Sequence, residues 1–216
     1  MSINYLQPTV APETPRHSLS LIKATNDTLK GYGCLVNNYE DYPIEIVTWS
    51  KPIGRPIDDG TGNQAGTKKG IFEFWWEGDY CFGKNNAVED EYLLGWSKNP
   101  EEAKRGPLPE SVPGSILLWH ANYHPDGGQL FYPLDKTPFI VPLALPGDDI
   151  VPQKFVAFYF DGTEGLYIHP NIWHEGVFPL APKARFYDIQ GAVHARVSVV
   201  FAEEFGVLLN VPLHHL

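Results

Sequence analysis

The chain has 216 residues, of which 43% are hydrophobic, and this is enough material for one sizeable core. Its formal net charge is −10 and its basic residues are scattered, so neither nucleic acid nor an anionic membrane is expected as a partner. The sequence has no basic start followed by an apolar run, and no stretch reaches the roughly 18 apolar residues of a membrane span. We therefore expect one cytoplasmic domain, residues 1–216.

Composition also bears on the fold class. Twenty glycines, twenty prolines and 13% aromatic residues disfavour a helical protein and favour short strands with many turns. Only two cysteines occur, Cys34 and Cys81, each in an apolar, strand-like context. They are better interpreted as core thiols than as a disulfide framework or a zinc site.

The N-terminal part of the chain predicts an extended arm and two short strands. Residues 1–16 contain three prolines and form an arm that covers a sheet edge or a neighbouring subunit. Strands are expected at 19–24 and 44–50, and residues 26–31 resemble a single helical turn closed by a glycine. The polar, glycine-rich segment 54–70 predicts a surface loop or a lid.

The middle of the chain is unusually aromatic. Residues 71–86 predict a hairpin that turns at Glu77-Gly78-Asp79, and Phe74, Trp75 and Trp76 require burial on both faces. The segment 99–110 is the one longer candidate for a helix or a linker, although prolines interrupt it.

From residue 115 onward short strands recur about every ten residues, separated by turn sequences such as PDGG, PGDD and DGTEG. This spacing is typical of a β-sandwich or an antiparallel barrel. The expected strands are 115–121, 129–134, 139–145, 154–160, 165–170, 185–189, 194–201 and 207–211.

Four of the eight histidines form two tight groups at predicted strand ends: His120 with His124, and His169 with His174. Imidazole is the commonest metal ligand, and a carboxylate or amide oxygen often completes such a site. The alternative for any single histidine is an exposed turn or a barrel position. His214 and His215 lie at the end of the sequence and are not assigned a role.

Two motifs resemble a known family. Residues His124–Pro133 resemble the HPxGxQxFxP motif of ureidoglycolate lyases, a cupin-fold family, and residues 165–174 resemble its second motif, GxxxHxxxWH. Residues 144–149 and 152–160 also match in order, and the segment 26–36 matches loosely. The resemblance implies an all-β, cupin-type antiparallel β-barrel or jelly roll with a few short helices, whose best-matching core is 115–205.

The resemblance further implies an amidine-type lyase that cleaves ureidoglycolate to glyoxylate and urea without water as a reactant. Such chemistry needs a base near the carbinol hydroxyl, stabilisation of the leaving nitrogen and a positive anchor for the substrate carboxylate. It also implies a homodimer, whose interface is expected within residues 1–16 or 71–96.

Roles for individual residues follow from the same resemblance. A divalent metal ion (Zn, Mn, Fe or Ni) is expected on His120, His124, Gln129 and His174, and no organic cofactor is expected. The catalytic candidates are His124, His169 and Glu164. The substrate-binding candidates are Arg196, Tyr167, Gln129 and Lys154. Strand alternation puts His194, Arg196 and Ser198 on one face, so Arg196 can point into the barrel.

The sequence departs from the family pattern in three places. Asn122 stands where a glutamate is usual, and Glu175-Gly176 follow His174 where a histidine and a proline are usual. Residues 40–114 are longer and more aromatic than in the family, which can rebuild the rim of the pocket and change the substrate.

Two other functions therefore remain open. A metal-dependent cupin dioxygenase or isomerase could use the same histidines, and iron with oxygen consumption would favour it. A non-catalytic cupin that binds a small molecule is the second alternative; the clustered histidines count against it and Asn122 counts in its favour.

Overall fold

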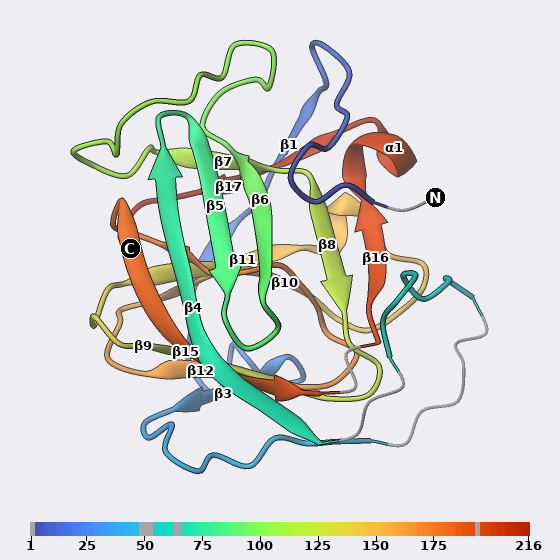
Figure 1. Ribbon diagram of the computed structural model, residues 1–216, viewed down its shortest axis with the longest axis vertical. Helices are drawn as coiled ribbons and strands as arrows, with labels where there is room; N and C mark the ends of the chain where they lie inside the picture. Colours follow the sequence, from blue (N-terminus) through green and yellow to red (C-terminus); the bar gives the residue numbers. More distant parts are fainter. Residues whose placement is uncertain (1–2, 48–53, 63–65, 193–194) are drawn as a thin grey trace.

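The computed structural model describes residues 3–47, 54–62, 66–192 and 195–216. Within these ranges the regular structure is almost entirely β-strand, as Figure 1 shows. The helices of the described residues are a 3₁₀ turn, η1 (Pro152–Lys154), and one short α-helix, α1 (Phe201–Phe205). The all-β, cupin-like fold class and its few short helices are thus confirmed.

The described strands form two sheets. The larger has ten strands in the order β1-β17-β7-β6-β5-β4-β15-β9-β12-β3. Their bounds are β1 (Arg16–Ser18), β17 (Leu208–Pro212), β7 (Ser115–Leu118), β6 (Asp90–Trp96), β5 (Tyr80–Asn85), β4 (Thr67–Glu77), β15 (Lys183–Gly191), β9 (Gln129–Pro133), β12 (Gly165–Ile168) and β3 (Gly33–Val36).

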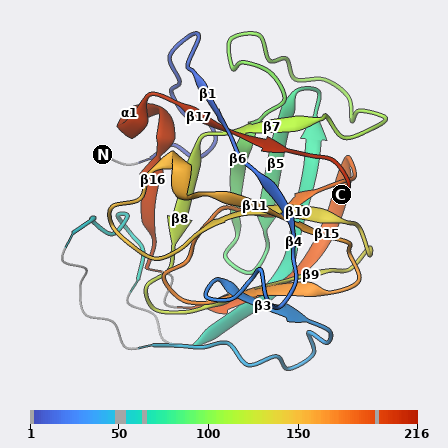
Figure 2. The same cartoon turned by 180° about the vertical axis from the view of Figure 1, so that it is seen from behind.

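The second sheet has the order β16-β8-β13-β10-β11-β2, and β14 also pairs with β10. Its strands are β16 (Val197–Val200), β8 (His120–Tyr123), β13 (Trp173–His174), β10 (Phe139–Ala144), β11 (Val156–Phe160), β2 (Leu21–Lys23) and β14 (Phe178–Pro179). In Figure 1 β4, β5 and β6 lie in front, and in Figure 2 β10 and β11 are seen from the other side.

Most strand pairs are antiparallel, as predicted, but two pairs are parallel: β1 with β17 and β2 with β11. Both involve the N-terminal part of the chain, which adds short strands to strands that come much later in the sequence. β1 begins at the last residue of the expected arm and pairs with β17 at the edge of the larger sheet.

The core lies between the sheets and is filled by alternate residues of facing strands. In β4 the side chains of Phe72, Phe74 and Trp76 point inward and are at most 5% exposed, whereas Trp75 packs in a second cluster with Phe82. Removing such a large buried ring typically costs about 3–5 kcal/mol of stability. The aromatic segment therefore supplies a major part of the core.

The predicted hairpin is confirmed as β4 and β5, and the strands predicted after residue 115 are present with small shifts of their ends. Of the two alternatives expected for residues 99–110, the structure has the linker: the segment forms turns and irregular structure, because prolines interrupt it. One prediction was wrong. The strand expected at 194–201 ends at Val200, and Phe201 begins α1, which the left-handed Gly206 terminates.

Other predictions were confirmed in part. In the segment 44–50, Ile46 forms an isolated bridge with Gly127, and residues 48–50 lie outside the described residues. The predicted loop 54–70 ends in β4, which begins at Thr67; its residues 63–65, like His194, lie outside the described residues. No helix among the described residues is long and apolar enough to cross a membrane.

Candidate active site

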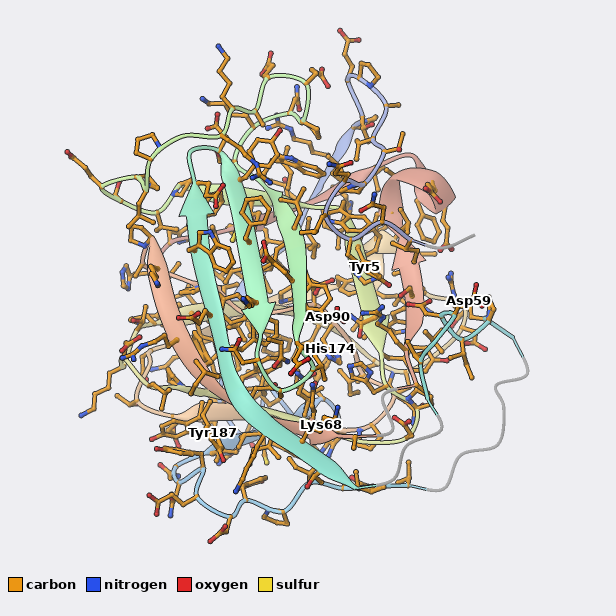
Figure 3. All side chains as sticks on the ribbon, viewed as in Figure 1. Tyr5, Asp59, Lys68, Asp90, His174 and Tyr187 are labelled. Carbon is orange, nitrogen blue, oxygen red and sulfur yellow. The ribbon has the colours of Figure 1, made fainter. Side chains whose placement is uncertain are left out.

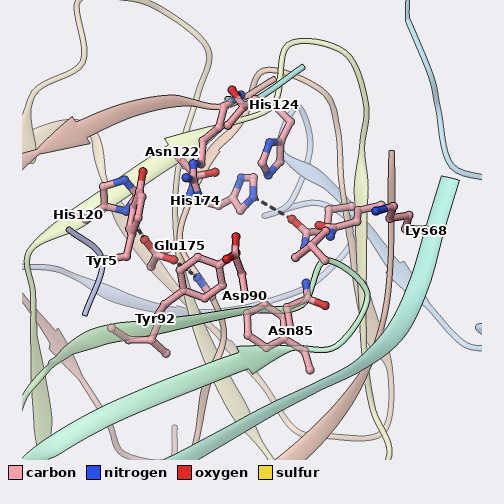
Figure 4. Close-up of a pocket in the computed structure, with 18 of the residues that line it drawn as sticks. Tyr5, Lys68, Asn85, Asp90, Tyr92, His120, Asn122, His124, His174 and Glu175 are labelled. Carbon is pink, nitrogen blue, oxygen red and sulfur yellow. Dashed lines mark hydrogen bonds and ion pairs between the residues drawn. The ribbon is translucent and has the colours of Figure 1, made fainter. Parts of the chain in front are cut away.

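A pocket of about 250 Å³ lies between the two sheets (Figure 4). Side chains from both sheets and from the N-terminal arm line it. The polar and aromatic members are Tyr5, Thr61, Lys68, Phe72, Asn85, Asp90, Tyr92, Trp119, His120, Asn122, His124, Gln129, Phe131, His174, Glu175, Gln190 and Arg196. Ionisable groups of both signs, aromatic rings and amides thus meet in one enclosed space.

Strand alternation explains why these residues converge. In β8 the side chains of His120 and Asn122 line the pocket, while Ala121 and Tyr123 belong to the core. Figure 3 shows His174 and Asp90 near the middle of the molecule, and Tyr187 on its lower left.

The larger sheet contributes a row of three polar residues across three strands. Gln190 of β15 is in register with Gln129 of β9 on one side and with Lys68 of β4 on the other. The second sheet contributes a matching row, in which Asn122 of β8 is in register with His174 of β13 and Ser198 of β16.

His120 is held between a carboxylate and a hydroxyl. Its Nδ1 lies 2.5 Å from Glu175 Oε2, and its Nε2 lies 2.9 Å from Ser198 Oγ. Burial by itself would raise the pKa of Glu175, but the charge and the hydrogen bond of His120 outweigh it, and the pKa is lowered. Glu175 is therefore an anion at neutral pH and orients the imidazole.

A second carboxylate, Asp58, links this pair to the N-terminal arm. Its Oδ2 accepts hydrogen bonds from Ser198 Oγ at 2.6 Å, Tyr5 Oη at 2.8 Å and Arg196 Nε at 2.9 Å. The guanidinium of Arg196 lies 4.2 Å from the centre of the Tyr5 ring, a cation–π contact. Burial raises the pKa of Tyr5, so its hydroxyl stays neutral and donates.

His174 begins a chain of buried groups. Its Nε2 lies 3.1 Å from Gln129 Oε1, and Gln129 Nε2 donates to Asp188 Oδ1 at 2.7 Å. Asn85 Nδ2 donates to the other oxygen of Asp188 at 3.0 Å. Burial lowers the pKa of His174, and burial raises the pKa of Asp188 to about 7, against the effect of its two amide partners.

The lowered pKa of His174 favours its neutral form, and the raised pKa of Asp188 favours its protonated form. His174 Nδ1 donates to the carbonyl of Ile172 at 2.7 Å, so a neutral His174 carries its proton there and accepts at Nε2. The Gln129 amide can form hydrogen bonds with neutral His174 and protonated Asp188 in one orientation. In it the amide nitrogen donates to His174 Nε2 and the amide oxygen accepts from Asp188. Gln129 thus couples the proton positions of His174 and Asp188.

His124 lines the pocket beside His174, with the ring centres 5.2 Å apart. Its Nδ1 lies 3.1 Å from the carbonyl oxygen of Ala195 and donates to it. This hydrogen bond selects the tautomer in which Nε2 is the basic nitrogen.

The predicted metal ligands do not fit a metal ion in this arrangement. Both ring nitrogens of His120 and both of His174 are within hydrogen-bond distance of protein groups, and the Gln129 amide lies between His174 and Asp188 rather than facing an open position. Among the described residues, no group of three or more His, Cys, Asp or Glu side chains is placed to hold one ion.

The structure brings together five of the predicted site residues around the pocket: His120, His124, Gln129, His174 and Arg196. It does not bring the other four there. His169 is exposed and lies 3.9 Å from Glu45, and Glu164 lines a separate hollow beside Lys23.

The two remaining residues also lie elsewhere. Tyr167 accepts a hydrogen bond from the Glu45 backbone and packs on the outer face of β12 with Leu130. Lys154 lies in η1 and pairs with Asp149 at 2.6 Å. The roles predicted for these residues stay predictions.

Sequence reasoning missed several residues that line the pocket or support it. Two sequence signals could have found some of them. Glu175 directly follows the motif residue His174, and Asp188 and Gln190 lie two residues apart in β15 and so share one face of the strand. Lys68 and Asn85 gave no such signal, because only the pairing of β4, β5 and β15 brings them to the histidines.

Comparison with known proteins agrees with the two motifs. Residues 111–207 match the family model of ureidoglycolate lyase. The chain is similar to the ureidoglycolate lyase of Azotobacter vinelandii, at 33% identity over 104 residues, which is 47% of this chain and 63% of that protein. It is 34% identical to that of Stutzerimonas stutzeri over 103 residues, which is 47% of this chain and 61% of the relative.

The ureidoglycolate lyase of Pseudomonas aeruginosa is 38% identical over 89 residues, 40% of this chain and 53% of the relative. The chain thus spans less than two thirds of the length of these curated relatives. The part of the pocket built by Tyr5, Lys68, Asn85 and Asp90 lies outside the matched segment. The matched segment, residues 111–207, is similar to ureidoglycolate lyases.

Proposed function

We propose that this protein is a lyase that cleaves ureidoglycolate to glyoxylate and urea. The observation that carries the proposal is that His120 and His124 of the matched segment line one pocket together with the cationic side chains Arg196 and Lys68. A base, an acid and a positive anchor are the three groups that this reaction needs.

In the proposed reaction His124 Nε2 takes the proton of the carbinol hydroxyl. The electron pair of the O–H bond forms the aldehyde C=O bond as the C–N bond breaks, and the leaving nitrogen takes up a proton. His120, held by the anionic Glu175, supplies that proton from Nε2, which exchanges its hydrogen bond with Ser198 Oγ for one with the leaving nitrogen. Products are glyoxylate and urea, and no water is consumed.

The substrate carboxylate is held by positive charge. Arg196 was the predicted anchor, but its Nε is paired with Asp58 at 2.9 Å, which neutralises much of its charge. Among the described residues no carboxylate forms an ion pair with Lys68, which lines the pocket from β4. We therefore assign the main anchoring role to Lys68 and a supporting role to Arg196.

The test is release of glyoxylate from ureidoglycolate by the purified protein, compared with His124→Ala and, as a matched control, His169→Ala. We expect activity to fall at least 100-fold in the first variant and to stay near the wild-type level in the second. No glyoxylate from the wild-type protein would overturn the proposal. Metal analysis and oxygen consumption on the same sample would reveal the alternative dioxygenase.

We also propose a cytoplasmic homodimer. Cys34 and Cys81 are both free thiols, which suits a reducing compartment. The predicted interface segment 71–96 includes half-buried aromatic residues such as Trp75 and Tyr80. Sedimentation analysis showing a monomer would contradict the dimer, and cell fractionation would test the compartment.

A further inference from the structure

Two buried amide atoms in the pocket have no hydrogen-bond partner among the described residues. Among the described residues, three buried side-chain nitrogen or oxygen atoms lack a hydrogen bond, and two of them, Asn122 Oδ1 and Gln190 Nε2, belong to residues that line the pocket. Asn122 is 8% exposed and Gln190 is 3% exposed. An unpaired buried polar atom costs stability, so such atoms at a pocket wall indicate a ligand that completes them.

The two atoms lie on opposite sheets. Asn122 is the middle residue of the row His174–Asn122–Ser198 in the second sheet, and Gln190 is the middle residue of the row Gln129–Gln190–Lys68 in the larger sheet. The contact between Gln129 and His174 joins the two rows. Each row therefore presents one unpaired amide atom to the pocket between the sheets.

The chemistry of the pair is complementary. One atom accepts a hydrogen bond and the other donates one, and the positions of both are set by paired strands. A ureido group, –NH–CO–NH₂, presents N–H donors and a carbonyl acceptor in one plane. It can therefore satisfy both sites at once, whereas a carboxylate offers acceptors alone.

We propose that Asn122 and Gln190 bind the ureido group of the substrate and select ureido compounds over plain hydroxy acids. Asn122 Oδ1 accepts from a ureido N–H, and Gln190 Nε2 donates to the ureido carbonyl. This inference rests on the proposed function. Lys68 lies next to Gln190 in the sheet and holds the carboxylate end. A site built to form hydrogen bonds discriminates strongly against compounds that lack the matching groups.

Two inhibitors separate the ends of the substrate. N-carbamoylglycine carries the carboxylate and the ureido group but no carbinol, so it cannot be cleaved; glycolate carries the carboxylate and hydroxyl but no ureido group. Inhibition constants against ureidoglycolate are measured for the wild type, Asn122→Leu and Gln190→Met. These substitutions preserve the approximate shape, and the unpaired atoms that they remove form no hydrogen bond with the described residues.

We expect each substitution to raise the inhibition constant of N-carbamoylglycine about tenfold and to change that of glycolate less than twofold. The inference would be overturned if the substitutions weakened the binding of both compounds equally or of neither. In that case glyoxylate release by the wild type would still support the lyase. Absence of glyoxylate release would instead count against the function.

A second measurement avoids the variants. In the ¹⁵N-labelled wild-type protein, N-carbamoylglycine should shift the side-chain amide signals of Gln190 and Asn122, and glycolate should leave them in place. Unchanged signals with saturating N-carbamoylglycine would overturn the inference.

Discussion

His174 Nε2 lies 3.1 Å from Gln129 Oε1, although the two residues belong to different sheets. This contact joins the sheets beside the pocket and continues to Asp188, a fully buried carboxyl group. It places a buried acid behind the histidines, where its protonation affects both stability and the orientation of the Gln129 amide.

Asp188→Asn tests the buried acid. The pKa of Asp188 is raised from 3.8 to about 7, so between these pH values the folded protein binds a proton that the unfolded chain has released. This contribution to stability is fully present below pH 4 and is lost as the pH rises to 7. The loss is on the order of 4 kcal/mol.

Asparagine mimics the protonated acid, so Asp188→Asn should remove this pH dependence and be more stable than the wild type above pH 8. Thermal unfolding from pH 5 to 9 checks it. Parallel stability profiles for the two proteins would contradict the assignment.

Glu175→Gln tests the charge that holds His120. The amide keeps a hydrogen-bond partner for His120 Nδ1 but removes the negative charge 2.5 Å away. We expect kcat for glyoxylate release to fall about 100-fold, because the imidazole loses the anion that stabilises its protonated form. Glu164→Gln is the matched control, since Glu164 lines another hollow, and a similar loss in both variants would contradict the proposed role.

Lys68→Met tests the anchor for the carboxylate. Methionine keeps the aliphatic stem and removes the charge, so the KM for ureidoglycolate should rise about tenfold or more, with a smaller effect on kcat. The neighbouring Lys69 is exposed and does not line the pocket, which makes Lys69→Met the control. An unchanged KM in Lys68→Met would assign the anchor to Arg196 instead.

Tyr5→Phe and Tyr5→Ala test how the N-terminal arm completes the pocket. Phenylalanine removes the hydrogen bond to Asp58, and we expect a loss of about 1 kcal/mol in the free energy of unfolding. Alanine also removes the ring that contacts His120, Trp119 and Arg196, so the loss should rise to about 2–4 kcal/mol.

Urea denaturation measures both values. Leu6→Ala is the control because Leu6 is 42% exposed, and it should change stability by less than about 0.5 kcal/mol. Equal stability of Tyr5→Ala and the wild type would show that the arm does not depend on this contact.

The sequence by itself determined the β-rich class, the aromatic hairpin and the strands after residue 115, because alternation and turn residues are local signals. Two motifs also predicted the resemblance to ureidoglycolate lyases, whose family model matches residues 111–207, and the sequence singled out His120, His124, Gln129 and His174, which line the pocket. These residues could be grouped because each motif lies at a strand end beside a turn.

Only the tertiary structure decided which other groups reach the pocket. Tyr5, Lys68 and Asn85 come from segments far from the motifs, and strand pairing across long sequence separations brings them to the histidines. The same packing places His169 and Glu164 outside the pocket. Proton positions likewise depend on burial and on partners from other strands, so the pKa of Asp188 and the pairing of His120 with Glu175 required the fold.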